Sequence, residues 1–313
     1  MTKTAFIFPG QGSQSVGMLL AAHEAWPQVA DTFAEASDVL GFDLWQMACD
    51  GPAETLSLTA NTQPLILTAS VALFRAYRAL GGPMPDIAAG HSLGEFSALV
   101  AANSLDFSDA VRLVRQRGEA MQVSVPVGVG AMAAIIGLDD DAINATCATI
   151  SRGNEHVVLA VNYNSPGQVV IAGHAAAVEE AVVALKEAGA KRALPLPVSA
   201  PFHTPLMTHA GDVLREALAT TDLRDPLIPV ISNVDAQAQQ TALAIRDLLV
   251  QQVSAPVQWT GCVATMIDMG CERFVECGPG KVLSGLVKRI DKSKPCSVVE
   301  TPDDMGTTLA ELG

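Results

Sequence analysis

The stretch AAGHSLGEFSAL, residues 88–99, joins an apolar run to a tight turn and then to a helix-forming segment. The run at 86–91 has the length of a buried strand. Gly90 and Gly94 flank the turn, and residues without a β-carbon let a strand and a helix meet at close range. Ser92 lies at the apex, where its hydroxyl would point out of the fold toward the N–H groups of the next helix turn. This arrangement is typical of a nucleophile elbow, although a short Gly-x-Ser-x-Gly string also occurs in turns that only reverse the chain.

Strand and helix patterns alternate on either side of this turn. Residues 4–8 (TAFIF) have the pattern of a buried strand, and a helix is predicted over 64–80 with Pro64 in its first turn. Alternation of this kind favours an α/β fold with a mainly parallel sheet. Beyond residue 199 we expect the same alternation in strands at 227–233 and 273–276, helices near 240–254 and 259–269, a turn at 278–280 and a last helix.

The middle of the chain has a different order of elements. Two strand–helix units enclose a pair of strands joined by a short Asn-Ser-Pro turn, which is the β-α-β-β-α-β order of a ferredoxin-like unit. We therefore expect an α/β-hydrolase-like parallel-sheet core from residues 1–127 and 199–313, with a ferredoxin-like subdomain inserted at 128–198. The inserted elements are predicted at 131–138, 139–150, 156–163, 167–173, 175–189 and 192–198.

Composition excludes several classes of function. The chain has 313 residues, of which 49% are hydrophobic and 17% charged, and this predicts a packed globular protein. A net charge of −14 and an aromatic content of 4% argue against a nucleic-acid partner. The apolar stretch at 125–137 is shorter than the roughly 20 residues of a membrane span. The N-terminal residues lack the apolar core of a signal peptide, so no membrane partner is expected.

The cysteines and histidines show no metal-binding or redox pattern. Six cysteines include no C-x-x-C pair, which predicts reduced thiols in a cytoplasmic protein. Six histidines lack metal spacing, and His203 and His209 would not share a helix face. We expect neither a metal nor a redox cofactor.

Arg117 falls on the inward face of a helix predicted at about 108–122. Ala110, Val114 and Met121 form an apolar stripe at helical spacing, and Arg117 continues it. A buried guanidinium is costly unless an anion pairs with it. Two interpretations follow: an ion pair with a carboxylate of the protein, or a bidentate clamp for a substrate carboxylate.

His203 stands where a helix is expected to begin. It follows the strand predicted at 192–198, and we expect Thr204 to cap the next helix and Pro205 to occupy its first turn. A serine nucleophile needs a nearby base, and His203 is a candidate. A histidine before a helix also commonly has a purely structural role.

Three glycine-containing segments partly match nucleotide-binding loops. Residues 10–14 (GQGSQ) follow the first strand, but Ser15 stands where the dinucleotide pattern needs glycine, and the similar segment at 128–133 precedes its strand. Residues 278–290 lack the full phosphate-loop pattern and predict a strand-to-helix turn. For the loop at 10–14 we expect backbone N–H groups that form half of an oxyanion hole, with the N–H of Leu93 as the other half.

Together these segments resemble the malonyl-CoA:acyl carrier protein transacylase family of type II fatty acid synthesis. The resemblance extends over essentially the whole chain, and the order and spacing of its segments are far more specific than one Gly-x-Ser-x-Gly string. The matching segments are FPGQGSQ, TQP at 62–64, GHSLGE, RQRGEAMQ at 115–122, NSPGQVVIAG at 164–173, APFH at 200–203, SNV at 232–234 and ECGPGKVLSGL at 276–286.

The resemblance implies a role for individual residues. Ser92 would be the nucleophile and His203 its general base, held by a glutamine carbonyl instead of an aspartate. Within QQVSAPVQW the matching glutamine is Gln252, with Gln251 as the register alternative. The resemblance also places the N–H groups of Gln11 and Leu93 at the oxyanion hole, and a further set of residues around the malonyl group: Arg117 at its carboxylate, with Gln63, Asn162, Met121 and Phe202 lining the pocket.

The activity implied is transfer of a malonyl group from malonyl-CoA to the phosphopantetheine thiol of acyl carrier protein by a ping-pong mechanism. Both partners are anionic, whereas this chain carries a net charge of −14. Binding would then need a local basic surface. The candidates for that surface are Lys191, Arg192, Lys281, Lys288 and Arg289. The alternative is that these five residues are ordinary solvated charges.

Two other classes of protein share part of this pattern. A serine esterase or thioesterase of the α/β-hydrolase type has the same elbow, but it expects an acid between serine and histidine in chain order and often an HGGG-type loop. A non-enzymatic component that binds acyl carrier protein would not need Ser92, His203 and Arg117 together. Hydrolysis without a carrier would favour the first, and absence of a covalent adduct the second.

Overall fold

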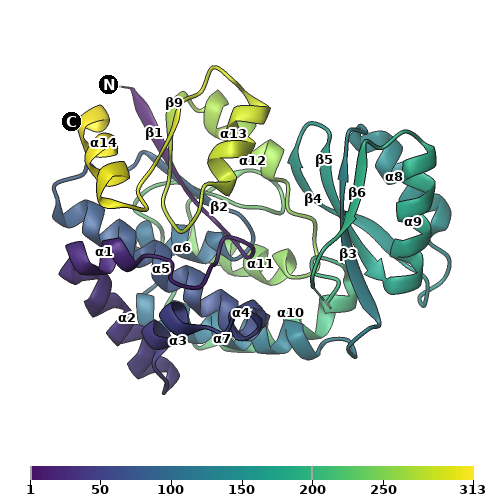
Figure 1. The fold of residues 1–313 in the computed structure, drawn as a ribbon, viewed down its shortest axis with the longest axis horizontal. Coiled ribbons are helices and arrows are strands. Elements are labelled where there is room, and N and C mark those ends of the chain that lie inside the picture. Colours follow the sequence, from purple (N-terminus) through teal and green to yellow (C-terminus); the bar gives the residue numbers. More distant parts are fainter. Residues whose placement is uncertain (1, 199) are drawn as a thin grey trace.

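A six-stranded sheet forms the centre of the larger part of the fold (Figure 1). The computed structural model describes residues 2–198 and 200–313. The strand order is β10-β9-β1-β2-β7-β8, and every neighbouring pair is parallel except β7 with β8. The strands are β1 (Lys3–Phe8), β2 (Ile87–Gly90), β7 (Val230–Ile231), β8 (Ala238–Gln239), β9 (Cys271–Glu276) and β10 (Cys296–Val298).

Alternate apolar residues of β1 explain why helices cover both faces of this sheet. Successive side chains of a strand point to opposite faces. Phe6 and Phe8 belong to a core cluster with α1 to α7, α10, α11 and α14, whereas Ala5 and Ile7 belong to a second cluster with α12 and α13. The helices are α1 (Leu20–Ala25), α2 (Pro27–Leu40), α3 (Leu44–Asp50), α4 (Ala53–Ser57), α5 (Thr59–Ala79), α6 (Gly94–Ala101), α7 (Phe107–Val123), α10 (Thr208–Ala219), α11 (Ala242–Gln252), α12 (Trp259–Asp268), α13 (Val282–Ile290) and α14 (Pro302–Leu312), with a 3-10 turn at Pro205–Met207.

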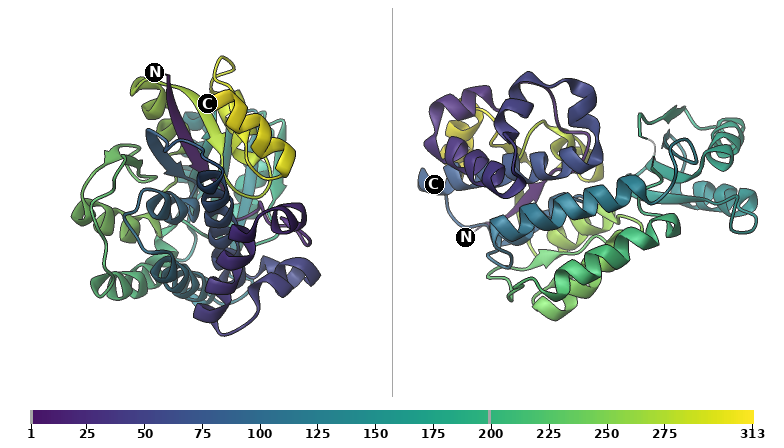
Figure 2. Two further views of the ribbon diagram at one scale, coloured as in Figure 1. Left: turned by 90° about the vertical axis from the view of Figure 1, so that its left-hand side faces the viewer. Right: turned by 90° about the horizontal axis from the view of Figure 1, so that it is seen from below.

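The smaller part, in teal, stands to one side of the larger part in the right-hand view of Figure 2. It contains a separate antiparallel sheet with the order β4-β5-β3-β6. One face packs on two helices. The other face carries Met132, Val161 and Val170, which pack with Phe202 of the larger part. The two parts therefore meet at this face. The elements are β3 (Gly130–Ile136), α8 (Asp140–Ile150), β4 (Val158–Ser165), β5 (Gln168–His174), α9 (Ala175–Glu187) and β6 (Arg192–Pro195).

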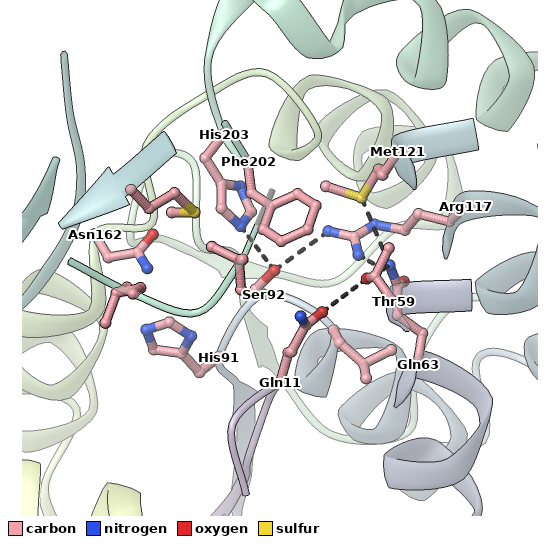
Figure 3. A pocket seen from close by; sticks show the side chains of 14 residues that line it. Gln11, Thr59, Gln63, His91, Ser92, Arg117, Met121, Asn162, Phe202 and His203 are labelled. Carbon is pink, nitrogen blue, oxygen red and sulfur yellow. Dashed lines mark hydrogen bonds between the residues drawn. The ribbon is translucent and has the colours of Figure 1, made fainter. Parts of the chain in front are cut away.

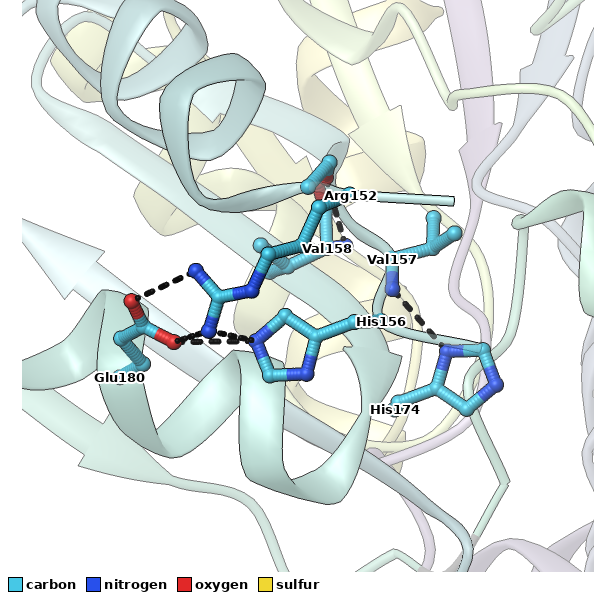
Figure 4. A network of polar contacts seen from close by, with 7 residues as sticks. Arg152, His156, Val157, Val158, His174 and Glu180 are labelled. Atoms are coloured by element: carbon cyan, nitrogen blue, oxygen red, sulfur yellow. Dashed lines mark hydrogen bonds and ion pairs between the residues drawn. The ribbon is translucent and has the colours of Figure 1, made fainter. Parts of the chain in front are cut away.

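A polar network holds the connection between α8 and β4 against α9 (Figure 4). Arg152 Nη2 and His156 Nε2 lie 2.7 and 2.9 Å from the same Glu180 carboxylate oxygen. The backbone N–H of Val157 donates to His174 Nδ1 at 3.1 Å. Arg152 and Glu180 are exposed, and solvent screens an exposed ion pair, so this network sets the path of the loop more than it stabilises the fold.

The predicted fold class is confirmed: a mainly parallel sheet with helices on both faces, plus an inserted β-α-β-β-α-β unit. The exact domain boundaries remain a prediction. The one expected between 198 and 199 falls at Ser199, which lies outside the described residues. Within the described ranges no helix is both long and apolar enough to cross a membrane.

Two local predictions about helix starts are wrong. Pro64 lies inside α5, which begins at Thr59. The Ala60 carbonyl, which a residue-64 N–H would have bonded, accepts from Arg115 Nη1 at 3.1 Å instead, and this contact offsets the missing bond. Thr204 does not cap the turn that follows it, because its hydroxyl donates to the Pro201 carbonyl at 2.7 Å.

Several element ends also differ from the sequence-based expectation. The strand predicted at 192–198 ends at Pro195, and only Val230–Ile231 of the strand predicted at 227–233 pairs in the sheet. The helix predicted to be last is followed by β10 and α14. Helices α1 to α4, between the first loop and α5, were not anticipated either.

Candidate functional site

The turn between β2 and α6 places Ser92 at the edge of the sheet. Ser92 has a φ of 51°, a left-handed conformation that is strained for serine and frequent at functional sites. A β-carbon on Gly90 would lie 1.8 Å from the Gly94 carbonyl carbon, and one on Gly94 would lie 2.0 Å from the Phe8 carbonyl oxygen. Only glycine fits either position, which is the close approach that the sequence predicts.

Asn233, just beyond β7, holds this turn from outside. Its Oδ1 accepts the Ser92 N–H at 2.6 Å, and its Nδ2 donates to the Gly90 carbonyl at 2.7 Å. The residue is fully buried. The sequence resemblance includes the SNV segment but assigns Asn233 no role; its position at the end of the strand predicted at 227–233 was the signal available.

Ser92, His203 and Gln252 form a hydrogen-bonded row. Ser92 Oγ lies 2.8 Å from His203 Nε2, and His203 Nδ1 lies 2.8 Å from the Gln252 backbone carbonyl. A carbonyl only accepts, so Nδ1 carries the proton and Nε2 is free to accept the serine proton. Gln251, the register alternative, is exposed, whereas Gln252 is fully buried.

The imidazole of His203 is held in its neutral form. Burial, followed by the nearby charge of Arg117, lowers the pKa of His203 to about 3. The unfolded chain binds this proton more readily than the folded one. The contribution of His203 to the free energy of unfolding is therefore complete above the unfolded pKa of about 6.5 and is lost as pH falls toward 3. A base of this kind is deprotonated throughout the neutral range.

The lowered pKa of His203 predicts that the reactivity of Ser92 changes little as the pH falls from 8 to 5. For an ordinary histidine, the neutral fraction of the imidazole would fall about 30-fold between high pH and pH 5. We expect the rate of Ser92 modification by an organophosphonate to change by less than about 3-fold between pH 8 and pH 5. Rates measured across pH 4.5–8, together with the NMR titration of the His203 ring, check this. A rate midpoint between pH 6 and 7 would contradict the neutral, buried base.

Arg117 lies on α7 with 1% of its surface exposed and points at the serine. Its Nη1 donates to Gln63 Oε1 at 2.7 Å, and its Nη2 to Gln252 Oε1 at 2.9 Å and to Ser92 Oγ at 3.3 Å. Burial lowers the pKa of Arg117 to about 10, with Glu95 opposing the shift, so the guanidinium is charged at neutral pH. Among the described residues no carboxylate lies within ion-pair distance of it, which leaves its charge available to an anionic ligand.

Gln11 and Leu93 line the same pocket as Ser92. The N–H groups of Gln11, in the loop after β1, and of Leu93, at the start of α6, bond to no other described residue. Preorganised backbone donors beside a nucleophile are the usual means of stabilising an oxyanion. The Gln11 side chain is itself fixed, because its Oε1 accepts from the Thr59 hydroxyl at 2.7 Å.

The serine opens into a cavity of about 110 Å³ between the two parts of the fold (Figure 3). Every predicted site residue lines it except Gln252, which lies behind Arg117 and His203. The Asn162 carboxamide oxygen is buried there without a hydrogen-bond partner among the described residues. Sequence reasoning missed several residues of the wall: Thr59, His91, Met132, Leu196 and Val198.

A second cavity, of about 240 Å³, adjoins the first. It shares Gln11, His91, Asn162 and Leu196 with the first cavity. It extends between β5 and α13, where Gln168 and Leu286 line it. Within residues 2–198 and 200–313 no three potential ligands are grouped as a metal site. The arrangement is a serine–histidine site with a buried cation, beside which a second cavity lies.

Comparison with known proteins agrees with this geometry. The profile of the acyl transferase domain family matches residues 5–305. A relative from Escherichia coli strain K12, named malonyl CoA-acyl carrier protein transacylase, is 55% identical over 309 residues, which cover 99% of each chain. The solved malonyl CoA-acyl carrier protein transacylase of Coxiella burnetii superposes with a TM-score of 0.97 at 45% identity, covering 99% of this chain and 98% of that one.

A further solved structure shows a relative with its protein partner. It is a malonyl-transacylase in complex with a type II PKS acyl-carrier protein, with a TM-score of 0.97 and 49% identity, covering 99% of this chain and 100% of that one. The similarity therefore spans the whole chain in both sequence and structure. The chain belongs to the acyl transferase family, in its malonyl-CoA:acyl carrier protein transacylase group.

Proposed function

We propose that this protein transfers the malonyl group of malonyl-CoA to the phosphopantetheine thiol of acyl carrier protein through a malonyl-Ser92 intermediate. One observation carries the proposal: Ser92 Oγ lies 2.8 Å from a neutral histidine nitrogen and 3.3 Å from a buried arginine nitrogen. The first contact supplies a base for acyl transfer, and the second supplies a cation for an acyl group that ends in a carboxylate. The names of the relatives support the same substrates.

In the first half-reaction His203 Nε2 takes the Ser92 proton while Oγ attacks the thioester carbon of malonyl-CoA. The resulting oxyanion would accept from the Gln11 and Leu93 N–H groups, each worth about 3 kcal/mol in comparable sites. Collapse breaks the carbon–sulfur bond, and His203 returns the proton to the departing thiol. The products are coenzyme A and malonyl-Ser92, with no cofactor involved in the proposed steps.

In the second half-reaction the carrier thiol occupies the place that coenzyme A has left. His203 takes the thiol proton, the sulfur attacks the malonyl-Ser92 ester, and the serine oxygen leaves with that proton. The second cavity, between β5 and α13, offers a path for a phosphopantetheine arm to reach Ser92. We infer that the malonyl-carrier product serves fatty acid chain elongation, as the sequence resemblance implies.

Selection of the malonyl group would rest on Arg117 and the residues around it. Gln63 holds one guanidinium nitrogen, and Gln63 Nε2 in turn lies 3.6 Å from Met121 Sδ. Phe202 closes the opposite wall against the smaller sheet. We propose that these side chains leave room for malonyl and exclude bulkier α-substituted acyl groups, with Asn162 lining the same pocket.

A basic edge beside the second cavity fits an anionic carrier. Arg192 on β6 and Gln168 on β5 pair with the same residue of β3, Ile136, and Arg289 of α13 donates to Gln168. Lys191 and Lys288 adjoin these two arginines in sequence, and both are exposed. Lys281 differs, because it pairs with Asp304 at 3.3 Å. The start of α13 beside it is not open to an anion either, since the Glu276 carboxylate accepts the N–H groups of Leu283 and Ser284.

We expect reversal of both charges in Lys288→Glu/Arg289→Glu to raise the KM for acyl carrier protein about tenfold at low salt. The reason is loss of electrostatic attraction, which salt screens, so the difference should shrink as ionic strength rises. Transfer kinetics at several salt concentrations measure it, with Lys281→Glu as the matched reversal at a cation already paired. A KM unchanged at every salt concentration removes Lys288 and Arg289 from the docking surface.

Intact mass spectrometry tests the proposed function directly. Brief incubation with malonyl-CoA should add one malonyl group to the protein, on Ser92, and addition of acyl carrier protein should move it to the carrier. A malonyl group lost to water at the same rate without carrier would mean a hydrolase, and no gain in mass would favour a binding protein. The six cysteines, all unpaired, support the cytoplasmic location that we also propose.

A further inference from the structure

Glu95 is a buried carboxyl group close to the site but outside its cavity. It lies in the first turn of α6 with 3% of its surface exposed, and it does not line either of the two cavities described above. One of its oxygens, Oε2, accepts both the Gln252 side-chain Nε2 at 2.8 Å and the Asn233 backbone N–H at 3.0 Å. None of the steps proposed above uses this group.

The bond from Gln252 fixes which way its amide points. Gln252 Nε2 donates to Glu95 Oε2 and, at 3.0 Å, to the Ser92 carbonyl, so both amide hydrogens are used. The amide oxygen is left facing Arg117 Nη2 at 2.9 Å. A flipped amide would place N–H groups against the guanidinium and its oxygen against a carboxylate and a carbonyl. Glu95 therefore keeps the Gln252 amide oxygen in the position where it accepts from Arg117.

We propose that Glu95 is a positioning residue for malonyl recognition, which orients the Gln252 amide and through it the guanidinium of Arg117 without touching the substrate. This inference rests on the proposed function. A general stabilising role is a weaker explanation, because the Glu95 carboxyl accepts from two other elements and not from the first N–H groups of its own helix. Glu276 shows that other arrangement, since its carboxyl accepts from Leu283 and Ser284 at the start of α13.

The surroundings of Glu95 allow its role as a hydrogen-bond acceptor to be tested separately from its negative charge. Charged or titratable groups face it from three elements: Arg117 on α7, Asp235 after β7 and Cys262 on α12. Burial raises the pKa of Glu95 to about 7. Both hydrogen bonds end on one oxygen, so they survive protonation of the other, and a glutamine oxygen at the same place would keep them.

Two substitutions therefore test the proposal. Glu95→Gln keeps the acceptor, and we expect its KM for malonyl-CoA to stay within about 3-fold of the original. Glu95→Met fills the volume without an acceptor, and we expect the KM for malonyl-CoA to rise about tenfold or more, since the Gln252 amide is released beside a buried cation. Acylation by acetyl-CoA, which does not use Arg117, should change by less than about 3-fold in both variants.

The outcomes are distinguishable from each other and from failure of the proposed function. Equal losses with malonyl and acetyl groups, or no loss in Glu95→Met, would overturn the positioning role. A Glu95→Gln protein as impaired as Glu95→Met would assign the effect to charge. If Glu95→Met does not fold, Glu95→Asp replaces it, because the shorter side chain withdraws the carboxylate from Gln252 and should raise the malonyl-CoA KM in the same way. Failure of the original protein to form a malonyl adduct would instead reject the proposed function.

Discussion

A Ser92→Ala protein is expected to gain no mass from malonyl-CoA and to lose malonyl transfer by about 10⁴-fold or more. Removal of a nucleophile leaves only the binding and oxyanion contributions of a site, and in comparable enzymes the loss is of this size or greater. The missing hydroxyl also leaves His203 Nε2 and Arg117 Nη2 without the atom that both contact. Intact mass and steady-state transfer to the carrier are the two measurements.

Ser97→Ala is the matched control for this substitution. Ser97 lies on α6, the helix that follows the Ser92 turn; it is fully buried, and its hydroxyl has no hydrogen-bond partner among the described residues. Its removal should leave transfer within about 2-fold. If Ser92→Ala still accumulated a stable malonyl adduct, the acyl group would be carried by another residue, and the elbow would lose its proposed role.

The tight turn and the inward arginine could be predicted because both are local properties of the sequence. Gly90 and Gly94 mark the turn by lacking β-carbons, and the structure shows backbone atoms within 2.0 Å of both places where a β-carbon would lie. Arg117 continues the stripe of Ala110 and Val114, and all three are buried as the helical spacing requires. Signals of this kind need only the residues of one strand, turn or helix.

The contacts that organise the site could not be predicted in this way. Glu95, Asn233 and Gln252 come from α6, the segment after β7, and α11, and only the fold brings them together. A sequence pattern gives no distance between such segments. Glu95, the charged residue within the otherwise uncharged GEFSALVA helix, was the visible sign in the sequence that a buried polar partner was required.

The missed elements have a similar explanation. Helix α14 begins with Thr301 as cap and Pro302 in its first turn, a signal that is readable in the sequence. Helices α1 and α4 are short, without a side-chain cap, and packing against the main core supports them, as Ala22 and Leu56 show. The helix start predicted at Pro64 is wrong because α5 tolerates the proline through a contact from the distant Arg115, and no local sequence rule describes such a contact.

Replacement of Arg117 by alanine is expected to abolish the preference for malonyl groups. A site built to pair a substrate carboxylate discriminates against a group without one by roughly 10³–10⁵-fold, and this discrimination is lost with the guanidinium. We expect kcat/KM for malonyl transfer to fall about 10³-fold or more, while acylation by acetyl-CoA falls less than about tenfold. Parallel measurements with malonyl-CoA and acetyl-CoA give the ratio directly.

Arg112→Ala on the same helix is the matched control, because Arg112 is exposed and, among the residues that the structure describes, forms an ion pair with Asp109 alone. A second readout separates electrostatics from misfolding. The charge of Arg117 contributes to the lowered pKa of His203, so its removal should move that pKa upward and bring the acid limb of acetyl transfer toward neutral pH. Equal loss of both substrates with an unmoved acid limb would mean that Arg117 supports the cavity and does not select the acyl group. A malonyl-specific loss with a raised acid limb would mean that one buried cation both selects the carboxylate and keeps the base neutral.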